Sequence, residues 1–142
     1  MSRILVIDDA VTVRMYHRKM LADAGWGVEE AANGLEALEK LMAAGSGDPH
    51  FDLYVVDVNM PKMDGYSFVR AMRRAGHVRA APVLMVSTEA QASDARAALD
   101  AGANAYLVKP ARPQQLVLTA ALLMGDAPAA RRAASAMQEG RA

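Results

Sequence analysis

The chain has 142 residues, carries 16 basic and 16 acidic side chains and contains no cysteine. Its length suits one domain with a hydrophobic core. A net charge of zero gives no electrostatic footprint of a nucleic-acid-binding protein, and the lack of cysteine excludes disulfides and cysteine metal clusters. No apolar run approaches the roughly 20 residues of a membrane span, and the first residues lack the pattern of a secretory signal. We therefore expect a cytoplasmic protein that neither binds nucleic acid nor inserts into a membrane.

Short aliphatic runs alternate along the chain with segments of helical periodicity. The first run, from Ile4 to Ile7, has no polar alternation, which is typical of a strand buried on both faces of a parallel sheet. Four further segments are strand candidates. The expected strands are 4–7, 27–31, 53–56, 82–86 and 105–108, and the expected helices are 12–24, 33–44, 66–73, 93–101 and 113–124.

Several residues indicate where these helices begin, where they end and which side faces the core. Gly25 and Gly102 stand at C-terminal caps, Ser93 at the N-terminal cap of the fourth helix, and Pro113 suits the first turn of the last helix. The apolar positions expected to face the core in the first two helices are Val13, Tyr16, Met20, Ala24, Leu35, Leu38, Leu41 and Met42.

Three segments have a composition of their own. Residues 45–50, "GSGDPH", have flexible turn chemistry. The basic run 70–79 is predicted to be a solvated helix end whose charges complement the helix dipole, with kinase docking as the alternative. The tail 126–142 is rich in Ala and Arg, and we expect it to be either a short helix or disordered.

The alternation of strands and helices predicts an α/β fold. We expect a single doubly wound five-stranded parallel sheet with helices on both faces, formed by residues 1–125 and followed by the tail.

Polar side chains follow four of the predicted strands: Asp8 and Asp9, then Asp57, Ser87 and Lys109. In a parallel sheet these strand ends share one edge, where ligands bind. Three carboxylates gathered there repel one another unless a cation joins them, and Mg²⁺ with oxygen ligands fits best. Lys109 and Ser87 are suited to bind phosphoryl oxygens, which equips Asp57 for covalent chemistry. Taken singly, each residue has a plain structural alternative, such as an acid that caps the next helix.

The motifs around these positions are "VIDDA", "VVDVNMPKMDG", "VSTEA" and "YLVKP". In this order, and over about residues 3–124, they resemble the response regulator receiver domain. Among receivers the chain is most similar to those that act alone in chemotaxis. The resemblance implies a flavodoxin-like fold with the strand order 2-1-3-4-5, which is known for the chemotaxis regulator and comes here from the resemblance alone.

The resemblance also implies a role for each matching residue. Asp57 would accept a phosphoryl group from a histidine kinase or a phosphotransfer protein. Mg²⁺ would be held by Asp9 and Asp57, by the backbone carbonyl of Asn59, and by Asp8 mostly through a water. Lys109 would contact the phosphoryl group, and Ser87 would bond to it after activation. Tyr106 would be an aromatic switch, and Asn59 and Glu89 would tune dephosphorylation. The peptide bond Lys109-Pro110 would be cis.

The expected function is that of a monomeric response regulator, not an enzyme beyond its own phosphotransfer and dephosphorylation. Its output partner, such as a flagellar motor component, would bind the face made by the fourth helix, the fifth strand and the last helix. A relay intermediate or phosphate sink is the alternative. A haloacid-dehalogenase-like phosphatase needs a second Asp two positions after its nucleophile, where this chain has Asn59. A P-loop hydrolase is excluded because no Gly-rich stretch ends in Lys followed by Ser or Thr.

The chain departs from the family pattern in three places. Ser87 stands where many members have Thr, the connection around residues 45–50 is longer than usual, and the tail beyond Gly125 has no counterpart.

Overall fold

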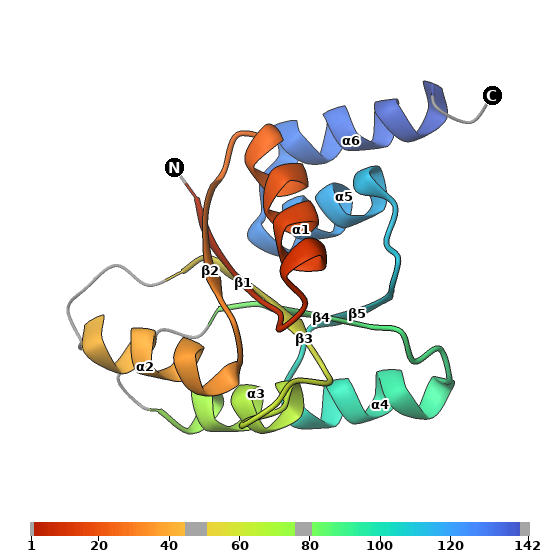
Figure 1. Ribbon diagram of the computed structural model, residues 1–142. Helices are drawn as coiled ribbons and strands as arrows, with labels where there is room; N and C mark the ends of the chain where they lie inside the picture. The colour runs from red at the N-terminus through yellow and green to blue at the C-terminus, as the bar shows by residue number, and fades with distance from the viewer. Residues whose placement is uncertain (1, 45–50, 76–80, 140–142) are drawn as a thin grey trace.

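The computed structural model describes residues 2–44, 51–75 and 81–139 (Figure 1). Strands and helices alternate along the chain up to α5, and one further helix follows. Their bounds are β1 Arg3–Ile7, α1 Val11–Asp23, β2 Gly27–Ala31, α2 Gly34–Ala44, β3 Leu53–Asp57, α3 Gly65–Arg74, β4 Val83–Ser87, α4 Ala92–Ala101, β5 Ala105–Val108, α5 Pro113–Met124 and α6 Ala127–Glu139.

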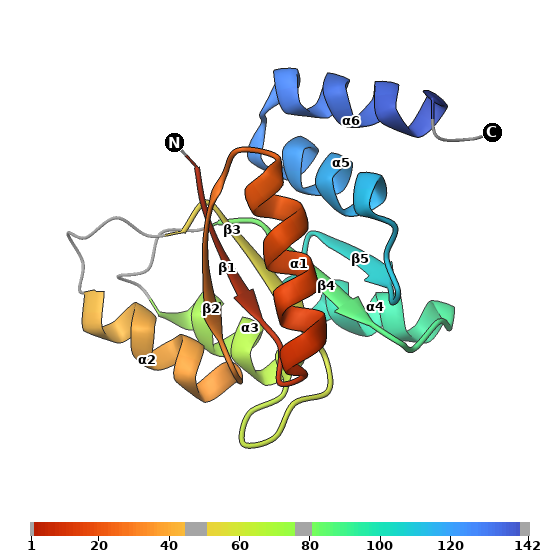
Figure 2. The same ribbon diagram turned by 45° about the horizontal axis from the view of Figure 1, so that its top comes forward.

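The five strands form one parallel sheet in the order β2-β1-β3-β4-β5. Helices α1 and α5 cover one face of the sheet, and α2, α3 and α4 cover the other (Figures 1 and 2). The predicted fold class and the strand order implied by the resemblance are therefore confirmed. Helix α6 lies on the outer side of α5, away from the sheet.

The continuous aliphatic runs place the central strands in the core because both of their faces are covered. Every residue of β3 and β4 is buried. One core cluster lies between the sheet and α2, α3 and α4, and the other lies between the sheet and α1, α5 and α6. Within the described ranges, no helix combines the length and the apolar composition needed to cross a bilayer.

The element bounds differ from the predictions mainly at the ends. Asp57 and Ser87 are the last residues of their strands rather than the first residues after them. The prediction that Ser93 caps α4 is wrong, because the N-cap is Gln91. The carboxylate of Asp94 accepts the backbone N–H of Gln91 at 3.1 Å and satisfies this helix end instead. The predicted turn at 45–50 lies outside the described residues.

The predicted buried faces of the first two helices are only partly correct. In α1 the fully buried side chains are His17 and Leu21, whereas Tyr16 is exposed. In α2, Leu41 is buried, but Leu35 and Met42 are both 41% exposed. Apolar spacing alone therefore placed the buried face of α1 about one residue away from its observed position. For α2 it predicted a buried face that is too wide.

The basic end of α3 does more than the sequence indicates. The guanidinium of Arg73 donates to the carbonyl oxygens of Ala81 at 2.7 Å and Gly102 at 2.8 Å, and to the side chain of Asn104 at 3.0 Å. Asn104 in turn accepts the backbone N–H of Val83 at 2.9 Å. Arg73 therefore joins α3 to the end of α4 and to the starts of β4 and β5. The rest of the basic run, residues 76–79, lies outside the described residues.

Helix α6 is anchored at its start by one carboxylate. Asp126 accepts the indole N–H of Trp26 at 2.9 Å, across 100 positions of the chain, and the backbone N–H of Ala129 at 3.1 Å. It therefore caps α6 and ties it to the segment before β2. Gly125 makes the tight link from α5 possible because its φ of 74° lies in the left-handed region.

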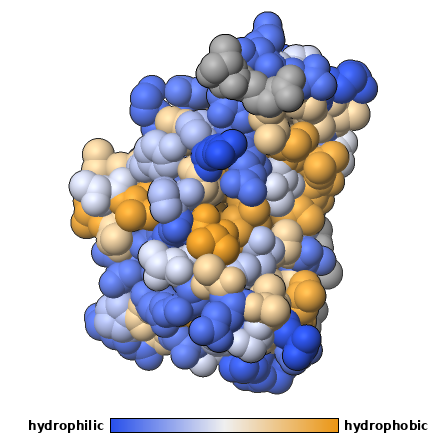
Figure 3. Space-filling model, turned by 90° about the vertical axis from the view of Figure 1, so that its right-hand side faces the viewer, coloured by the Kyte–Doolittle hydropathy of each residue, from blue (hydrophilic) through white to orange (hydrophobic). Residues whose placement is uncertain are grey.

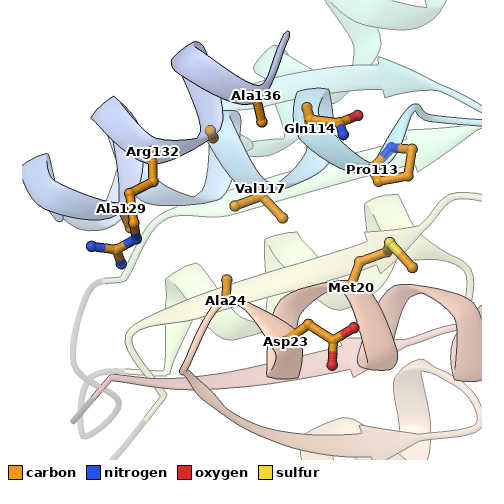
Figure 4. Close-up of a pocket in the computed structure, with 10 residues that line it drawn as sticks. Met20, Asp23, Ala24, Pro113, Gln114, Val117, Ala129, Arg132 and Ala136 are labelled. Carbon is orange, nitrogen blue, oxygen red and sulfur yellow. The ribbon is translucent and has the colours of Figure 1, made fainter. Parts of the chain in front are cut away.

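Alanine side chains form most of the contact that α6 makes with the rest of the molecule. Ala129, Ala130 and Ala133 are buried. Because these side chains are small, a pocket of about 270 Å³ remains between α1, α5 and α6, with Met20 and Val117 on its walls (Figure 4). The residues described for the tail therefore form a helix. The hydrogen bonds of Asp126 at its start fix its position more specifically than the alanine side chains do.

We expect Asp126→Ala to loosen α6. The substitution removes both the helix cap and the acceptor of Trp26, so the unfolding midpoint should fall and the fluorescence of Trp26, the single tryptophan, should move toward that of an indole in water. Asp100→Ala, at an exposed position of α4, is the control and should change neither. An unchanged Trp26 spectrum in Asp126→Ala would show that Asp126 does not anchor the helix.

Candidate functional site

The register of the sheet brings the polar strand ends together. Val56 pairs with Ile7, so Asp57 lies beside Asp8, and Ser87 pairs with Val108 just before Lys109. The loop between β3 and α3 projects beyond the same edge (Figure 2). The structure therefore gathers the acids, Ser87 and Lys109 at the carboxyl edge of the sheet, as the sequence predicts.

Lys109 is the cation of this edge. Its ammonium donates to the carboxylate of Asp8 at 2.7 Å and to that of Asp57 at 2.9 Å. Burial alone would lower the pKa of Lys109, but the two carboxylates outweigh it and raise this pKa. Lys109 therefore stays charged and joins β5 to β1 and β3.

Asp57 is a carboxylate held in an unfavourable environment. It is 5% exposed. Burial raises its pKa to about 6, the hydrogen bond from Lys109 opposes this rise, and the charge of Asp8 adds to it. The site therefore carries more negative charge than Lys109 alone can balance.

The three carboxylates fit a hard divalent cation. One oxygen from each of Asp8, Asp9 and Asp57 lies within 4.8 Å of the others. Asp8 and Asp57 are buried, whereas Asp9 is exposed and opens the cluster to solvent. Oxygen ligands of this kind, with room for waters, are what Mg²⁺ prefers, and the cluster is typical of a receiver Mg²⁺ site.

Neither of the first two acids caps α1. The N-cap is Ala10, and no side chain bonds to this helix end. The carboxylate of Asp8 instead accepts the backbone N–H of Ala10 at 2.9 Å, which orients it toward the site. The capping alternative for these acids is therefore wrong.

The backbone of Glu89 connects the two residues implied as switches. Its N–H donates to the hydroxyl oxygen of Ser87 at 3.1 Å, and its carbonyl accepts the hydroxyl of Tyr106 at 2.7 Å. Ser87 is buried and Tyr106 is half-buried. The side chains of Glu89 and Asn59 are both exposed, on the loops that follow β4 and β3.

Gly65 lets the loop after β3 pack closely against the end of β3. A Cβ at this position would lie 2.3 Å from the backbone oxygen of Asp57 and 2.8 Å from the side chain of Met85. The N–H of Gly65 donates to the carbonyl of Val58 at 2.8 Å. Only glycine fits, which explains the end of the "MPKMDG" motif. The peptide Lys109-Pro110, on the opposite side of the site, is cis as expected.

Sequence reasoning missed two residues around the site. Arg14 donates to the backbone oxygen of Asp8 at 2.6 Å and to Glu30 at 2.7 Å, so it joins α1 and β2 to the site. His17 is 2% exposed, and it lines the same pocket as Lys109. A signal for His17 was available, because it lies four residues from both Val13 and Leu21 on one helix face.

Residues 4–121 match the model of the response regulator receiver domain family. The chain belongs to this family. It is therefore a signalling domain of the two-component type rather than a catalytic one, and a receiver domain implies a histidine kinase as partner. Helix α6 lies beyond the residues that match the receiver model.

Individual receivers resemble the chain over most of its length. It is 36% identical over 115 residues to the chemotaxis protein CheY1 of Helicobacter pylori, which covers 80% of this chain and 90% of that protein. The solved structure of the chemotaxis response regulator CheY4 of Vibrio cholerae has 36% identity and a TM-score of 0.77, with 87% of this chain and 98% of that one covered. The gliding motility regulatory protein of Myxococcus xanthus is 39% identical over 107 residues, but the chain spans only 13% of its length.

The raised pKa of Asp57 makes the stability of the metal-free receiver depend on pH. The folded chain holds this proton more tightly than the unfolded chain. The stabilising contribution is therefore complete below the ordinary pKa of 3.8 and is lost as the pH rises through about 6. A pKa difference of about two corresponds to at most ~3 kcal/mol. Asp57→Asn replaces a charged partner of Lys109 with a neutral amide that does not titrate. We therefore expect the stability of this variant relative to the wild type to rise by roughly 1–2 kcal/mol from about pH 5 to about pH 7.

Urea unfolding in the presence of a chelator measures this gain. Asp100→Asn, at an exposed position of α4, is the matched control, and its difference from the wild type should not vary over the same pH range. A stability difference for Asp57→Asn that stays constant with pH would show that Asp57 titrates like an ordinary carboxyl group.

Proposed function

We propose that the chain is a response regulator that accepts a phosphoryl group on Asp57 from a histidine kinase or a phosphotransfer protein, and that it acts in chemotaxis. The observation that carries the proposal is that Asp57 lies with Asp8 and Asp9 at the carboxyl edge of the sheet and accepts a hydrogen bond from the ammonium of Lys109. A nucleophilic carboxylate oxygen attacks the phosphorus, the bond from phosphorus to the donor nitrogen breaks, and an acyl phosphate forms on Asp57.

Asp8, Asp9 and Asp57 would hold Mg²⁺ together with the backbone carbonyl of Asn59. When bound, the ion neutralises charge that develops on the phosphoryl oxygens. The ammonium of Lys109 also neutralises negative charge, since it is within hydrogen-bond distance of Asp57 and can move to a phosphoryl oxygen. Asp9 supplies charge and not packing, because it is exposed.

The lifetime of the acyl phosphate depends on access of water. Asn59 and Glu89 carry exposed polar side chains on two loops that border the carboxyl edge of the sheet. We assign them the tuning of dephosphorylation, through the orientation of the attacking water. Asn59 also argues against a haloacid-dehalogenase-like phosphatase, because an amide cannot serve as the general acid that such an enzyme needs at this position.

Ser87 and Tyr106 are the proposed switch. In the unphosphorylated protein both hydroxyls bond to the backbone of Glu89. When Ser87 moves to donate to a phosphoryl oxygen, its hydrogen bond from the N–H of Glu89 shifts or breaks. The backbone of Glu89 then moves, and the hydrogen bond between its carbonyl and the Tyr106 hydroxyl changes as well. A local bond at the site thereby alters β5 and the start of α4, which is a shift between two discrete arrangements.

The surface that reports this change is the face made by α4, β5 and α5. Each of these elements exposes a large apolar side chain, with Leu99 55%, Val108 42% and Leu122 65% exposed. Figure 3 shows the side of the molecule on which β5 ends, where apolar groups gather between polar ones. Exposed apolar surface of this kind is typical of a protein interaction site. An output protein such as a flagellar motor component would bind there, to a monomer.

The role in chemotaxis rests on the similarity to CheY1 and CheY4. A relay intermediate or a phosphate sink is the second candidate. In either role the phosphoacceptor and its metal site are the same, and only the output partner differs.

Labelling with a small acyl phosphate and Mg²⁺ tests the phosphoacceptor. The wild type should be labelled on Asp57 alone. Asp57→Asn should show no labelling because the nucleophile is gone, and Asp9→Ala should lose nearly all labelling while it keeps its fold, because a charge-balancing ligand is lost. Asp100→Asn, far from the nucleophile in sequence and exposed, should be labelled like the wild type. Labelling of Asp57→Asn at the wild-type level would refute the assignment.

The decay of the label in the same experiment tests the tuning residues. Substituting Asn59 or Glu89 with Ala should change the half-life of the acyl phosphate by about tenfold or less and change its formation little, because these side chains act on water and not on the nucleophile. If both variants decay at the wild-type rate, the two residues have no such role.

Two further substitutions test the switch. Ser87→Ala should still be phosphorylated, but it should bind the output partner more weakly, because the phosphoryl group loses its link to Glu89. Tyr106→Ala should blunt the difference in affinity between the phosphorylated and unphosphorylated forms. Calorimetry or a pull-down with the partner measures both effects. Wild-type dependence on phosphate in both variants would place the switch elsewhere.

A further inference from the structure

The first two acids of the site lie on a segment without regular secondary structure. Residues 8–10 connect the end of β1 at Ile7 to the start of α1 at Val11, and no side chain caps this helix end. Asp9 is exposed, so packing does not fix its side chain. A mobile segment loses conformational freedom when its side chains bind an ion, and this loss weakens binding. The affinity of the site therefore depends on the contacts that hold residues 8–10.

Arg14 holds this segment from the first turn of α1. Its backbone N–H donates to the carbonyl oxygen of Ala10 at 2.9 Å, and its guanidinium donates to the carbonyl oxygen of Asp8 at 2.6 Å. The Asp8 oxygen belongs to the planar peptide unit between Asp8 and Asp9, which also contains the Cα atom of Asp9. The hydrogen bond to this oxygen therefore restricts the orientation of the whole unit, and with it the direction in which the Asp9 side chain leaves the backbone.

Glu30 on β2 orients the guanidinium of Arg14. Helix α1 lies alongside β2 (Figures 1 and 2). One carboxylate oxygen of Glu30 accepts from Nε of Arg14 at 2.7 Å, and the other accepts from Arg18 at 2.6 Å. These two hydrogen bonds lower the pKa of Glu30, so its carboxylate stays ionised. The side chain of Arg14 is only 15% exposed, and it is therefore held both by packing and by an ion pair.

We infer that Arg14 is a positioning residue for the metal-binding acids and that it acts through the peptide unit between Asp8 and Asp9. This inference rests on the proposed function, in which these two acids help to hold Mg²⁺. Because the guanidinium is planar, the hydrogen bond from Nε to Glu30 fixes the direction in which Nη1 donates to Asp8. The acids are thus held near their binding positions before the ion arrives, and less conformational freedom is lost when it binds.

The charge of Arg14 has the opposite effect on a cation site. A guanidinium stays protonated in proteins, and its positive charge repels a divalent cation. If Arg14 acted on the site through its charge alone, a neutral residue at this position would strengthen Mg²⁺ binding. If Arg14 positions the acids, the same substitution weakens Mg²⁺ binding. The sign of the change in affinity therefore distinguishes the two effects.

Titration of the amide NMR signals with MgCl₂ measures this sign in the unphosphorylated protein. Arg14→Met keeps a long side chain but loses both hydrogen bonds and the charge. We expect it to bind Mg²⁺ about three- to tenfold more weakly than the wild type, a smaller loss than is typical when a group that bonds directly to a ligand side chain is removed. Labelling of Asp57 by a small acyl phosphate should be slow at low Mg²⁺ concentration and should recover at saturating Mg²⁺.

Arg18→Met is the matched control. It removes the same charge from the same partner, because Arg18 bonds to Glu30 and to no other described residue. Its affinity for Mg²⁺ should equal or exceed that of the wild type. Binding by Arg14→Met that is as tight as in the wild type, or tighter, would overturn the inference. Equal losses in the two variants would also overturn it, because the bond to Asp8 would then not be responsible.

The wild type provides a further test that does not need a folded variant. A positioning role requires a rigid guanidinium, so the ¹⁵N order parameter of the Arg14 Nε–H should lie above about 0.6, the value below which a group counts as flexible. A lower order parameter would refute the positioning role, whether or not Arg14→Met folds. If the wild type itself neither binds Mg²⁺ nor is labelled on Asp57, the proposed function fails instead.

Discussion

The ammonium of Lys109 between the carboxylates of Asp8 and Asp57 is the interaction on which the site depends. It joins residues 101 and 52 positions apart and thereby holds the ends of β1, β3 and β5 to one point. Three acids share this one cation, so the site is electrostatically incomplete. Burial makes the imbalance larger, because it raises the energy of an ionised Asp57. A sheet edge with this charge balance favours a divalent cation.

The remaining parts of the fold position this edge or transmit its changes. Gly65 allows the loop after β3 to lie against the backbone of Asp57. Arg14 holds the backbone of Asp8 from α1. Arg73 fixes the opposite ends of β4 and β5 and the end of α4. These hydrogen bonds hold the amino ends of β4 and β5, and the backbone N–H of Lys109 donates to the carbonyl of Ser87 at 2.7 Å near their carboxyl ends.

Helix α6 adds a layer that lies outside the residues matching the receiver family. It covers part of α5 and continues the core cluster formed by α1 and α5. Its packing depends on alanines and on the capped start at Asp126. A surface of α5 and α1 that would otherwise meet solvent is thereby occupied, while the apolar side chain of Leu122 on α5 stays exposed. The additional helix therefore limits which side of the molecule a partner can use.

The sequence by itself determined the order of the elements through α5, the five parallel strands and the acids at their ends. It did so because hydrophobic periodicity, strand ends and turn residues are local signals. They can be recognised in a short stretch of sequence without information about which segments pack against it. The motifs around Asp57 and Lys109 are local in the same sense. For the tail, the sequence allowed either a helix or disorder. An Ala-rich segment with few large apolar side chains forms a stable helix only when the rest of the molecule offers a surface for it to pack on.

Only the tertiary structure decided which partners meet across long separations. Trp26 bonds to Asp126 at the start of α6, Arg73 binds two carbonyl oxygens while it stays exposed, and His17 takes a buried position that the apolar spacing had given to Tyr16. A polar side chain that loses water when elements pack needs a partner, and the partners of Trp26 and Arg73 lie far away in the chain. Such a pairing depends on the exact angle and register at which helices and strands meet, and no local pattern in the sequence contains that information.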